Sequence, residues 1–183
     1  FDGPYAVDPA YGGPEYETIS SLGSNLGIDD MRVIIKGNEL CNAYSLDTIS
    51  AGGTIAFAME CFEKGLLTRR DSGGLDLTWG NGEAMLKCLE LIAHNEGFGK
   101  MLSCGTAKLA ETIGQGATEF AMHVKGLDAG QHEPRLMAGF ALGFMINPHG
   151  ADHCCNVQDH KYAVEVGLKS LEPLGFNEPV PPL

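Results

Sequence analysis

The chain has 183 residues, of which 24 are Asp or Glu and 12 are Lys or Arg, so its formal net charge is -12. At roughly 150 residues per domain, this length predicts one domain or slightly more, and 44% hydrophobic residues are typical of a globular chain. The acidic balance argues against nucleic acid as a partner, since phosphate binding requires a basic patch.

A membrane partner is not expected either. The longest apolar run, residues 136–146, has 11 residues, far fewer than the roughly 20 that a membrane-spanning helix needs. The chain opens with Phe1 and Asp2 rather than with a basic and then an apolar stretch, so no signal peptide is predicted.

Helical patterns dominate the first 117 residues. After an irregular entry loop, a helix is expected to start at residues 13–17, with Pro14 in its first turn and acids near its positive end. A second helix is expected from about Asp30 to Tyr44. A third is capped by Asp47 or Thr48 and ends at residues 64–65, a cation followed by glycine. Its apolar stripe comprises Ile55, Ala58, Met59 and Phe62, at i, i+3, i+4 and i+7.

Three further elements complete this helical part. Residues 75–79 alternate like a short strand, residues 85–92 repeat the helical stripe and close at Gly97, and one helix is expected from Lys100 to Ile113. Residues 1–117 are therefore predicted to form a helical domain.

The pattern changes after residue 117, where a second domain is predicted to begin without being completed. A short strand is predicted over residues 120–124, a buried helix over 134–146, a turn over 147–150 and a loose tail over 171–183. The fold class is thus mainly α, with one or two short strands and an incomplete domain over residues 118–183.

The six cysteines show no C-x-x-C spacing. Cys61 and Cys88 fall on apolar helical faces, where a reduced thiol behaves as a small hydrophobe. Cys154 and Cys155 are adjacent, and a disulfide between neighbours is strained. These features indicate a reducing, cytoplasmic location.

Two interpretations remain open for Tyr16 and Glu17, in the first turn after Pro14. An acid at this place stabilises the helix dipole by about 0.3–1 kcal/mol. Alternatively, the carboxyl group faces a pocket from the start of the helix and transfers protons.

The junction over residues 42–48 also has two interpretations. Asp47 or Thr48 can simply cap the following helix. In the functional alternative, the amide and carboxylate side chains bind the amino and ring nitrogens of a heterocycle.

The segment over residues 149–160 concentrates ligand-type side chains. Its members are His149, Asp152, His153, Cys154, Cys155, Asp159 and His160. Their spacing matches no structural zinc pattern, which needs two paired ligand sets. A single functional histidine, His153, is the preferred interpretation, and no metal ligand is assigned.

Together these segments resemble the aldehyde:ferredoxin oxidoreductase family of tungsten-pterin enzymes. Order and spacing hold from about residue 12 to residue 160. The matching strings are residues 13–18 (GPEYET), 38–42 (NELCN), 46–50 (LDTIS), 54–60 (TIAFAME), 64–67 (KGLL), 119–127 (EFAMHVKGL), 133–135 (EPR) and 150–154 (GADHC).

The resemblance implies the helical middle domain of these enzymes plus the start of their last domain. It implies oxidation of an aldehyde to a carboxylic acid at tungsten or molybdenum held by two pterins, with electrons leaving through a [4Fe-4S] cluster to ferredoxin. Glu17 would then be the carboxylate that handles the proton, with Tyr16 beside it and Thr48 lining the same pocket. His153 would donate a hydrogen bond to the metal oxygen or to the aldehyde carbonyl.

Pterin contacts are implied for the motif Asn42, Ser45, Leu46 and Asp47, which departs from the family's D-x-x-G-L-D or D-x-x-G-L-C. Asn42 lacks the charge of the family's Asp but can still hydrogen-bond a pterin edge. Ser45 replaces a glycine, which predicts a turn made without a positive φ.

The family's C-x-x-C-x-x-x-C trio and its fourth cysteine are expected outside the given sequence, as is the domain with most pterin contacts. The chain is therefore interpreted as a fragment that neither binds the cofactors nor turns over alone. Ferredoxin, a small aldehyde, the rest of the same subunit and a second copy in a homodimer are the implied partners.

Two other functions stay open. The chain can belong to the tungsten catalytic subunit of a benzoyl-coenzyme A (aromatic ring) reductase, which resembles these enzymes in the same segments. It can also be a non-enzymatic helical domain that holds a structural metal at the His/Cys cluster.

Overall fold

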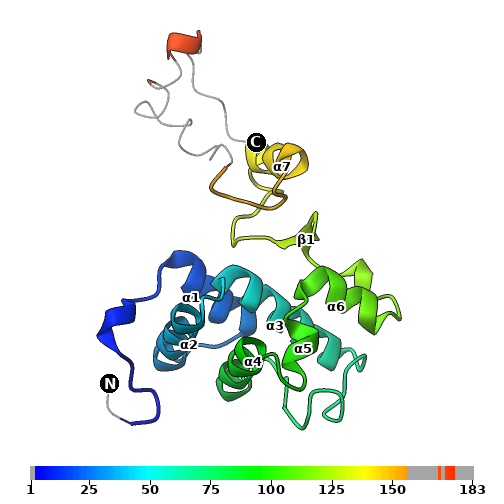
Figure 1. Cartoon of the computed structure of the whole chain (residues 1–183). Coiled ribbons are helices and arrows are strands. Elements are labelled where there is room, and N and C mark those ends of the chain that lie inside the picture. The colour runs from blue at the N-terminus through cyan, green and yellow to red at the C-terminus, as the bar shows by residue number, and fades with distance from the viewer. Residues whose placement is uncertain (1–2, 156–168, 170–171, 176–183) are drawn as a thin grey trace. The chain divides into compact units, whose positions relative to one another are not determined.

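The structure is a computed structural model that describes residues 3–155, 169 and 172–175 (Figure 1). The chain forms two compact units, residues 1–131 and 132–183. The predicted domain boundary near residue 117 stays a prediction. Asp159, His160 and most of the predicted loose tail lie outside the described residues.

The first unit is built almost entirely from helices, which confirms the mainly α fold class within the described residues. Its elements are η1 (Pro9–Tyr11), α1 (Tyr16–Leu22), η2 (Ser24–Leu26), α2 (Met31–Tyr44), α3 (Thr48–Glu63), α4 (Gly82–His94), α5 (Gly99–Leu102), α6 (Gly105–Ile113), η3 (Ala117–Glu119), β1 (His123–Val124) and β2 (Leu127–Asp128).

Short polar side chains fix where the helices begin. The Asp30 carboxylate accepts the Arg32 N–H ahead of α2, and the Asp47 carboxylate accepts the Ser50 N–H ahead of α3. Each satisfies one of the backbone donors that have no partner inside the helix. Both helix starts are as predicted.

The start of α1 differs from the prediction. Glu15 occupies the N-cap and its carboxylate accepts the Thr18 N–H, so Pro14 precedes the helix and does not lie in the first turn. Glu17 does lie in the first turn of α1, as predicted.

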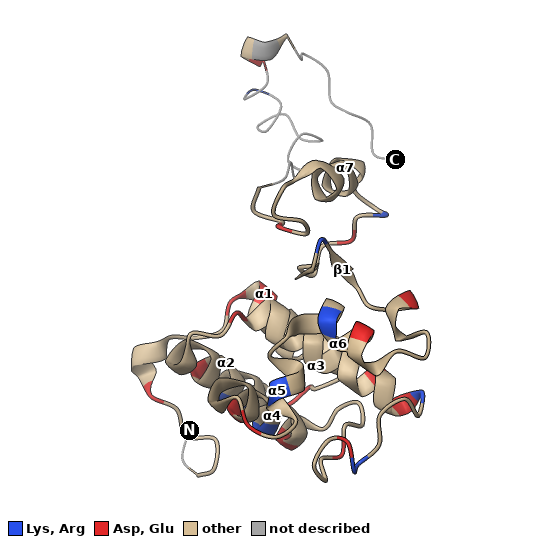
Figure 2. Cartoon of the chain, turned by 45° about the vertical axis from the view of Figure 1, so that its right-hand side comes forward, with Lys and Arg blue, Asp and Glu red and all other residues tan. Residues whose placement is uncertain are grey.

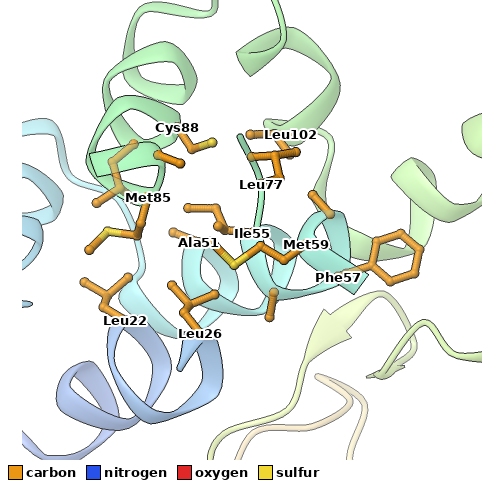
Figure 3. Packing of buried hydrophobic residues seen from close by; sticks show 14 of the residues in the cluster. Leu22, Leu26, Ala51, Ile55, Phe57, Met59, Leu77, Met85, Cys88 and Leu102 are labelled. Atoms are coloured by element: carbon orange, nitrogen blue, oxygen red, sulfur yellow. The ribbon is translucent and has the colours of Figure 1, made fainter. Parts of the chain in front are cut away.

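Helix α3 is the centre of the first unit and packs against α1, α4, α5 and α6 (Figure 1). In the close view, Ile55 and Met59 of α3 lie in the same apolar cluster as Leu22 of α1 and Met85 of α4 (Figure 3). Every residue of α3 from 54 to 59 is buried, which corrects the expectation of a single apolar stripe. Burial of each large apolar side chain contributes about 1.5–3 kcal/mol, so α3 supplies much of the core.

Two predicted elements of the first unit are wrong. Residues 75–79 form no strand, because no neighbouring strand pairs with them, although Leu77 is completely buried. The single helix expected over residues 100–113 is divided into α5 and α6. Gly105 takes a φ of 79°, a left-handed conformation that interrupts the helical path.

The end of α4 comes earlier than predicted. Asn95 adopts the left-handed conformation (φ 52°) and its N–H returns to Ile92, so the helix closes at His94 rather than at Gly97. The end of α3 is as predicted, with Lys64 at the C-cap and Gly65 at a φ of 72°.

Strands β1 and β2 form an antiparallel hairpin in which His123 pairs with Asp128 and Val124 with Leu127. Lys125 and Gly126 between them both have positive φ, as two-residue hairpin turns require. The strand predicted over residues 120–124 is thus shorter than expected, since its first residues follow η3 directly.

The described part of the second unit contains α7 (Ala138–Ile146) and η5 (Glu172–Leu174). The helix predicted as buried over residues 134–146 starts later, and only Phe140 and Phe144 of α7 are buried. Met145 and Ile146 are each 70% exposed, which corrects that expectation for the described residues. No charged residue lies on α7 (Figure 2).

The turn after α7 is as predicted. The Gly150 N–H donates to the Asn147 carbonyl at 3.1 Å, and Gly150 has a φ of 85°. Across the described ranges, every helix falls short of the length and apolarity needed to cross a membrane.

Candidate active site

Tyr16 and Glu17 at the start of α1 are held by the backbone of one distant residue, Gln131. The Gln131 N–H donates to Glu17 Oε2 at 2.8 Å. The Tyr16 hydroxyl donates to the Gln131 carbonyl at 2.9 Å. We call these two hydrogen bonds the Gln131 clamp. Glu17 is buried with 3% exposure while Tyr16 is exposed, so the Gln131 clamp fixes a buried carboxylate beside an accessible phenol.

Thr48 lies in the same region, because the starts of α1 and α3 are side by side. The Thr18 and Thr48 hydroxyls are 3.0 Å apart in a hydrogen bond, and Thr18 directly follows Glu17. Three of the predicted catalytic residues, Tyr16, Glu17 and Thr48, are therefore brought together by the fold of the first unit.

The junction between α2 and α3 holds the predicted pterin contacts. The Asn42 amide donates to the Asn38 carbonyl at 2.9 Å, and Leu46 packs on the core. One carboxylate oxygen of Asp47 accepts the Ser50 N–H at 2.7 Å. The capping interpretation of Asp47 is thereby confirmed, while Asn42 and Asp47 both remain exposed.

Ser45 contradicts its prediction. It adopts a left-handed conformation with a φ of 56°, where the family's motif has glycine. The turn keeps the geometry of a glycine turn, because the Leu46 N–H must return to the Cys41 carbonyl at 2.8 Å. The serine therefore carries the strain that glycine avoids.

The exposed oxygens of this junction fit a pterin edge. Such an edge presents amino and ring N–H donors, and the Asn42 amide and the Asp47 carboxylate each offer an acceptor oxygen. Asn42 uses its N–H group on Asn38, which leaves its oxygen for an outside donor. Asn42, Ser45, Leu46 and Asp47 thus stay the candidates for holding this cofactor.

The described cysteines do not fit an iron–sulfur cluster. No three of them come together among the candidate metal-binding groups of the described residues. Burial raises the pKa of Cys41 and Cys88 to about 12 and that of Cys61 to about 11, whereas a cluster ligand must be a thiolate. The prediction that Cys61 and Cys88 are buried, reduced thiols is confirmed.

His153 lies in the second unit within a compact polar group. Its ring stacks on His132 with 4.9 Å between centroids, and His132 stacks in turn on buried Phe140. Cys154 Sγ lies 3.5 Å from His153 Nε2. His153 is thus held by ring stacking on His132 and by a polar contact with Cys154.

Asp152 organises the two neighbouring cysteines. Its carboxylate accepts the Cys154 N–H at 2.8 Å and the Cys155 thiol at 2.9 Å. The thiol contact lowers the pKa of Asp152 and raises that of Cys155. Ligand atoms of Asp152, His153 and Cys154 lie within 4.8 Å of one another, but the carboxylate's use of its oxygens for local contacts favours a turn-stabilising role.

The convergence of Glu17 and His153 on one cavity stays a prediction, since the two residues belong to different compact units. Three residues of the first unit were missed by the sequence reasoning. Gln131 acts through its backbone and leaves no side-chain signal, and Thr18 is a generic helical residue. Asp128 could have been noticed as an acid inside an otherwise apolar hairpin strand.

The model of the family "Aldehyde ferredoxin oxidoreductase, domains 2 & 3" matches residues 1–181. The chain is 41% identical over 155 residues to the tungsten-containing aldehyde ferredoxin oxidoreductases of Pyrococcus furiosus and of Thermococcus kodakarensis. These alignments cover 84% of this chain and 25% of each relative, so the chain spans about a quarter of their length.

The chain is also similar to two other enzymes. The chain is 36% identical over 146 residues to the aliphatic sulfonate oxidoreductase, WOR-like subunit, of Pyrococcus furiosus, with 76% of this chain and 23% of the relative covered. It also resembles a chain of the active site complex BamBC of benzoyl coenzyme A reductase, in complex with 1,5-dienoyl-CoA. That match has a TM-score of 0.60 and 25% identity over 74% of this chain and 21% of the other.

Proposed function

The chain belongs to the aldehyde ferredoxin oxidoreductase family, and on that premise we propose that it is part of an enzyme that oxidises aldehydes to carboxylic acids. The proposed centre is tungsten, or molybdenum, held by two pterins, with a [4Fe-4S] cluster and ferredoxin as further redox partners of the whole subunit. The cluster's ligands are not among the cysteines described above.

The observation that carries the proposal is the fixed carboxylate of Glu17. The Gln131 N–H holds Glu17 Oε2 at 2.8 Å, and burial excludes water from the side chain. The metal–pterin group supplies the oxidation chemistry when it is bound. Conversion of an aldehyde and water to a carboxylic acid releases protons, and Glu17 takes a proton from the reacting water or aldehyde hydrate.

The other predicted residues have supporting roles in this proposal. Tyr16 and Thr48 line the substrate side of Glu17, and His153 donates a hydrogen bond to the aldehyde carbonyl, where negative charge grows during attack. Asn42, Ser45, Leu46 and Asp47 hold the pterin edge. The enzyme is proposed to work in the cytoplasm, because all six cysteines are free thiols.

Glu17→Gln in the full-length protein tests the proton-transfer role. The turnover rate with aldehydes should fall by about 10²–10⁴-fold, the usual contribution of a general base, while metal content and the circular dichroism spectrum stay unchanged. Glu15→Gln is the matched control, because Glu15 is exposed on the same helix start and glutamine keeps a capping oxygen. A Glu17→Gln enzyme with near wild-type turnover would contradict the assignment.

His153→Ala should lower turnover by about 10²–10³-fold, the cost of one lost donor to a developing oxyanion. Cys154→Ala, the exposed neighbour, is the control and should keep the wild-type rate. Equal rates in the two variants would remove His153 from the mechanism.

A second candidate is the catalytic subunit of an aromatic-ring reductase, supported by the structural likeness to the benzoyl coenzyme A reductase complex. Reduction of an aromatic thioester by the full-length protein, with no aldehyde oxidation, would favour this candidate. Family membership favours either enzyme over a non-enzymatic metal module, for which stoichiometric zinc without tungsten or molybdenum would be the evidence.

A further inference from the structure

A buried carboxylate, Asp128, occupies the end of β2 and has no role in the proposed reaction. It is 4% exposed, and β2 packs against both α3 and α6. Within the described residues, Asp128 Oδ1 has no hydrogen-bond partner. An incompletely satisfied buried carboxylate is costly, so its presence calls for a physical reason.

Gly53 on α3 creates the space that Asp128 occupies. A Cβ atom added at Gly53 would meet three atoms of the Asp128 side chain, with Oδ1 at 2.9 Å, Cβ at 3.1 Å and Cγ at 3.2 Å. The absence of a side chain at this position of α3 therefore lets β2 lie directly on the helix. The Asp128 side chain therefore packs directly against Gly53.

The polar groups that face Asp128 come from three elements. These groups are the Thr106 hydroxyl of α6, the His123 ring on β1 and the Asp47 carboxylate that caps α3. The Thr106 hydroxyl donates to the Thr54 hydroxyl of α3 at 3.3 Å. Burial outweighs the favourable effects of Thr106 and His123, which raises the pKa of Asp128 to about 6. Carboxyl groups in such unfavourable surroundings are found preferentially near functional sites.

The segment after Asp128 connects it to Glu17. Gln131 follows three residues later, and both of its backbone polar groups bond α1, through Glu17 Oε2 and the Tyr16 hydroxyl. The Thr18–Thr48 hydrogen bond fixes the start of α1 to the start of α3. Consecutive contacts thus link α3 to Asp128, the segment ending at Gln131 to α1, and α1 back to α3.

From these contacts we infer that Asp128 is a positioning residue. Its side chain packs against Gly53 and holds residues 128–131 in place, so that the Gln131 N–H orients the Glu17 carboxylate. The inference rests on the proposed role of Glu17 as the group that takes the proton. Asp128 itself touches neither substrate nor cofactor, and it acts through Gln131.

Three variants of the full-length holoenzyme test the inference. Asp128→Ala removes the side chain that packs against Gly53, and Gly53→Ala fills the space that this side chain occupies. Asp128→Asn keeps the side-chain shape without the charge. Glu111→Gln, an exposed acid on α6, is the matched control. Hydrogen exchange at the Gln131 amide, resolved by fragmentation mass spectrometry, reports the hydrogen bond from Gln131 to Glu17 independently of turnover.

In Asp128→Ala and Gly53→Ala the Gln131 amide should exchange at least about fivefold faster, the factor that one ordinary hydrogen bond provides. The kcat for aldehydes should fall about 10–100-fold while KM changes less than about threefold, since misorientation of a catalytic group affects the chemical step. Asp128→Asn and Glu111→Gln should remain within about twofold of wild type in both measurements. Because Gly53→Ala leaves Asp128 intact, it serves as the test if Asp128→Ala does not fold.

Unchanged exchange at Gln131 in both disruptive variants would overturn the positioning role, and the proposed function would stand if Glu17→Gln were still inactive. Faster exchange with an unchanged kcat, together with an active Glu17→Gln enzyme, would instead overturn the proposed role of Glu17 and the inference that rests on it. Loss of activity in Asp128→Asn equal to that in Asp128→Ala would also overturn the inference, since shape alone would then be insufficient.

Discussion

Asp128→Asn is expected to stabilise the first unit in a pH-dependent manner, because it removes a buried charge and retains the side-chain shape. Burial raises the pKa of Asp128 from its usual 3.8 to about 6. Between these values the folded chain retains a proton that the unfolded chain has released. The free energy of unfolding therefore falls as pH rises through this window.

The size of the effect follows from the same pKa values. The difference between about 6 and 3.8, at about 1.36 kcal/mol per pKa unit, corresponds to about 3 kcal/mol. A stabilisation of about 2–3 kcal/mol is therefore expected at pH 7. Near pH 3 the aspartic acid is neutral in both states, and the two proteins should be equally stable.

Urea unfolding of wild type and Asp128→Asn at several pH values from 3 to 8 measures this difference. Glu133, whose pKa is lowered to about 2 by Arg135, and Asp152, lowered by Cys155, titrate at lower pH in both proteins. Their contributions therefore cancel in the comparison. Glu111→Gln should show no pH-dependent difference. A stability difference for Asp128→Asn that is constant with pH, or a less stable variant at pH 7, would refute the reasoning.

The backbone strain at two other positions gives further predictions. Ser45→Gly should raise the free energy of unfolding by about 0.5–1 kcal/mol, because glycine adopts the left-handed conformation without steric cost; thermal unfolding with Ser45→Ala as control measures this, and equal melting temperatures for the two variants would contradict it. Gly52→Ala should lower stability by about 1–3 kcal/mol despite alanine's higher helix propensity, since its Cβ would lie 2.5 Å from the Ser21 carbonyl oxygen. An unchanged unfolding midpoint in Gly52→Ala would show that α1 and α3 separate without cost.

Much of the helical architecture was predictable because its signals are local. Asp30 and Asp47 bond backbone N–H groups two or three residues ahead, and Lys64-Gly65 ends α3 where the pattern indicated. The failures were local signals overruled by surroundings. Leu77 is buried within an irregular segment that lacks a strand partner, and the φ of Gly105 divides one apolar pattern into two helices.

The turn at Ser45 shows how an inference from residue type alone can be wrong. Serine at the family's glycine position predicted a turn without a positive φ, yet the backbone keeps the glycine geometry. The return of the Leu46 N–H to Cys41 decides the conformation, and the side chain accepts the strain. Residue preference is a weak term beside the backbone hydrogen bonds that end a helix.

The sequence by itself determined the mainly α fold, the bounds of α2 and α3, the family and the position of Glu17 in a first helical turn. These properties depend on residues within one or two turns of each other, or on strings that can be compared directly. Only the tertiary structure decided that Gln131 orients a carboxylate 114 positions earlier and that Asp128 is buried against Gly53. Such contacts arise from the packing of helices around α3, and a backbone N–H looks the same in every residue except proline until the fold gives it a partner.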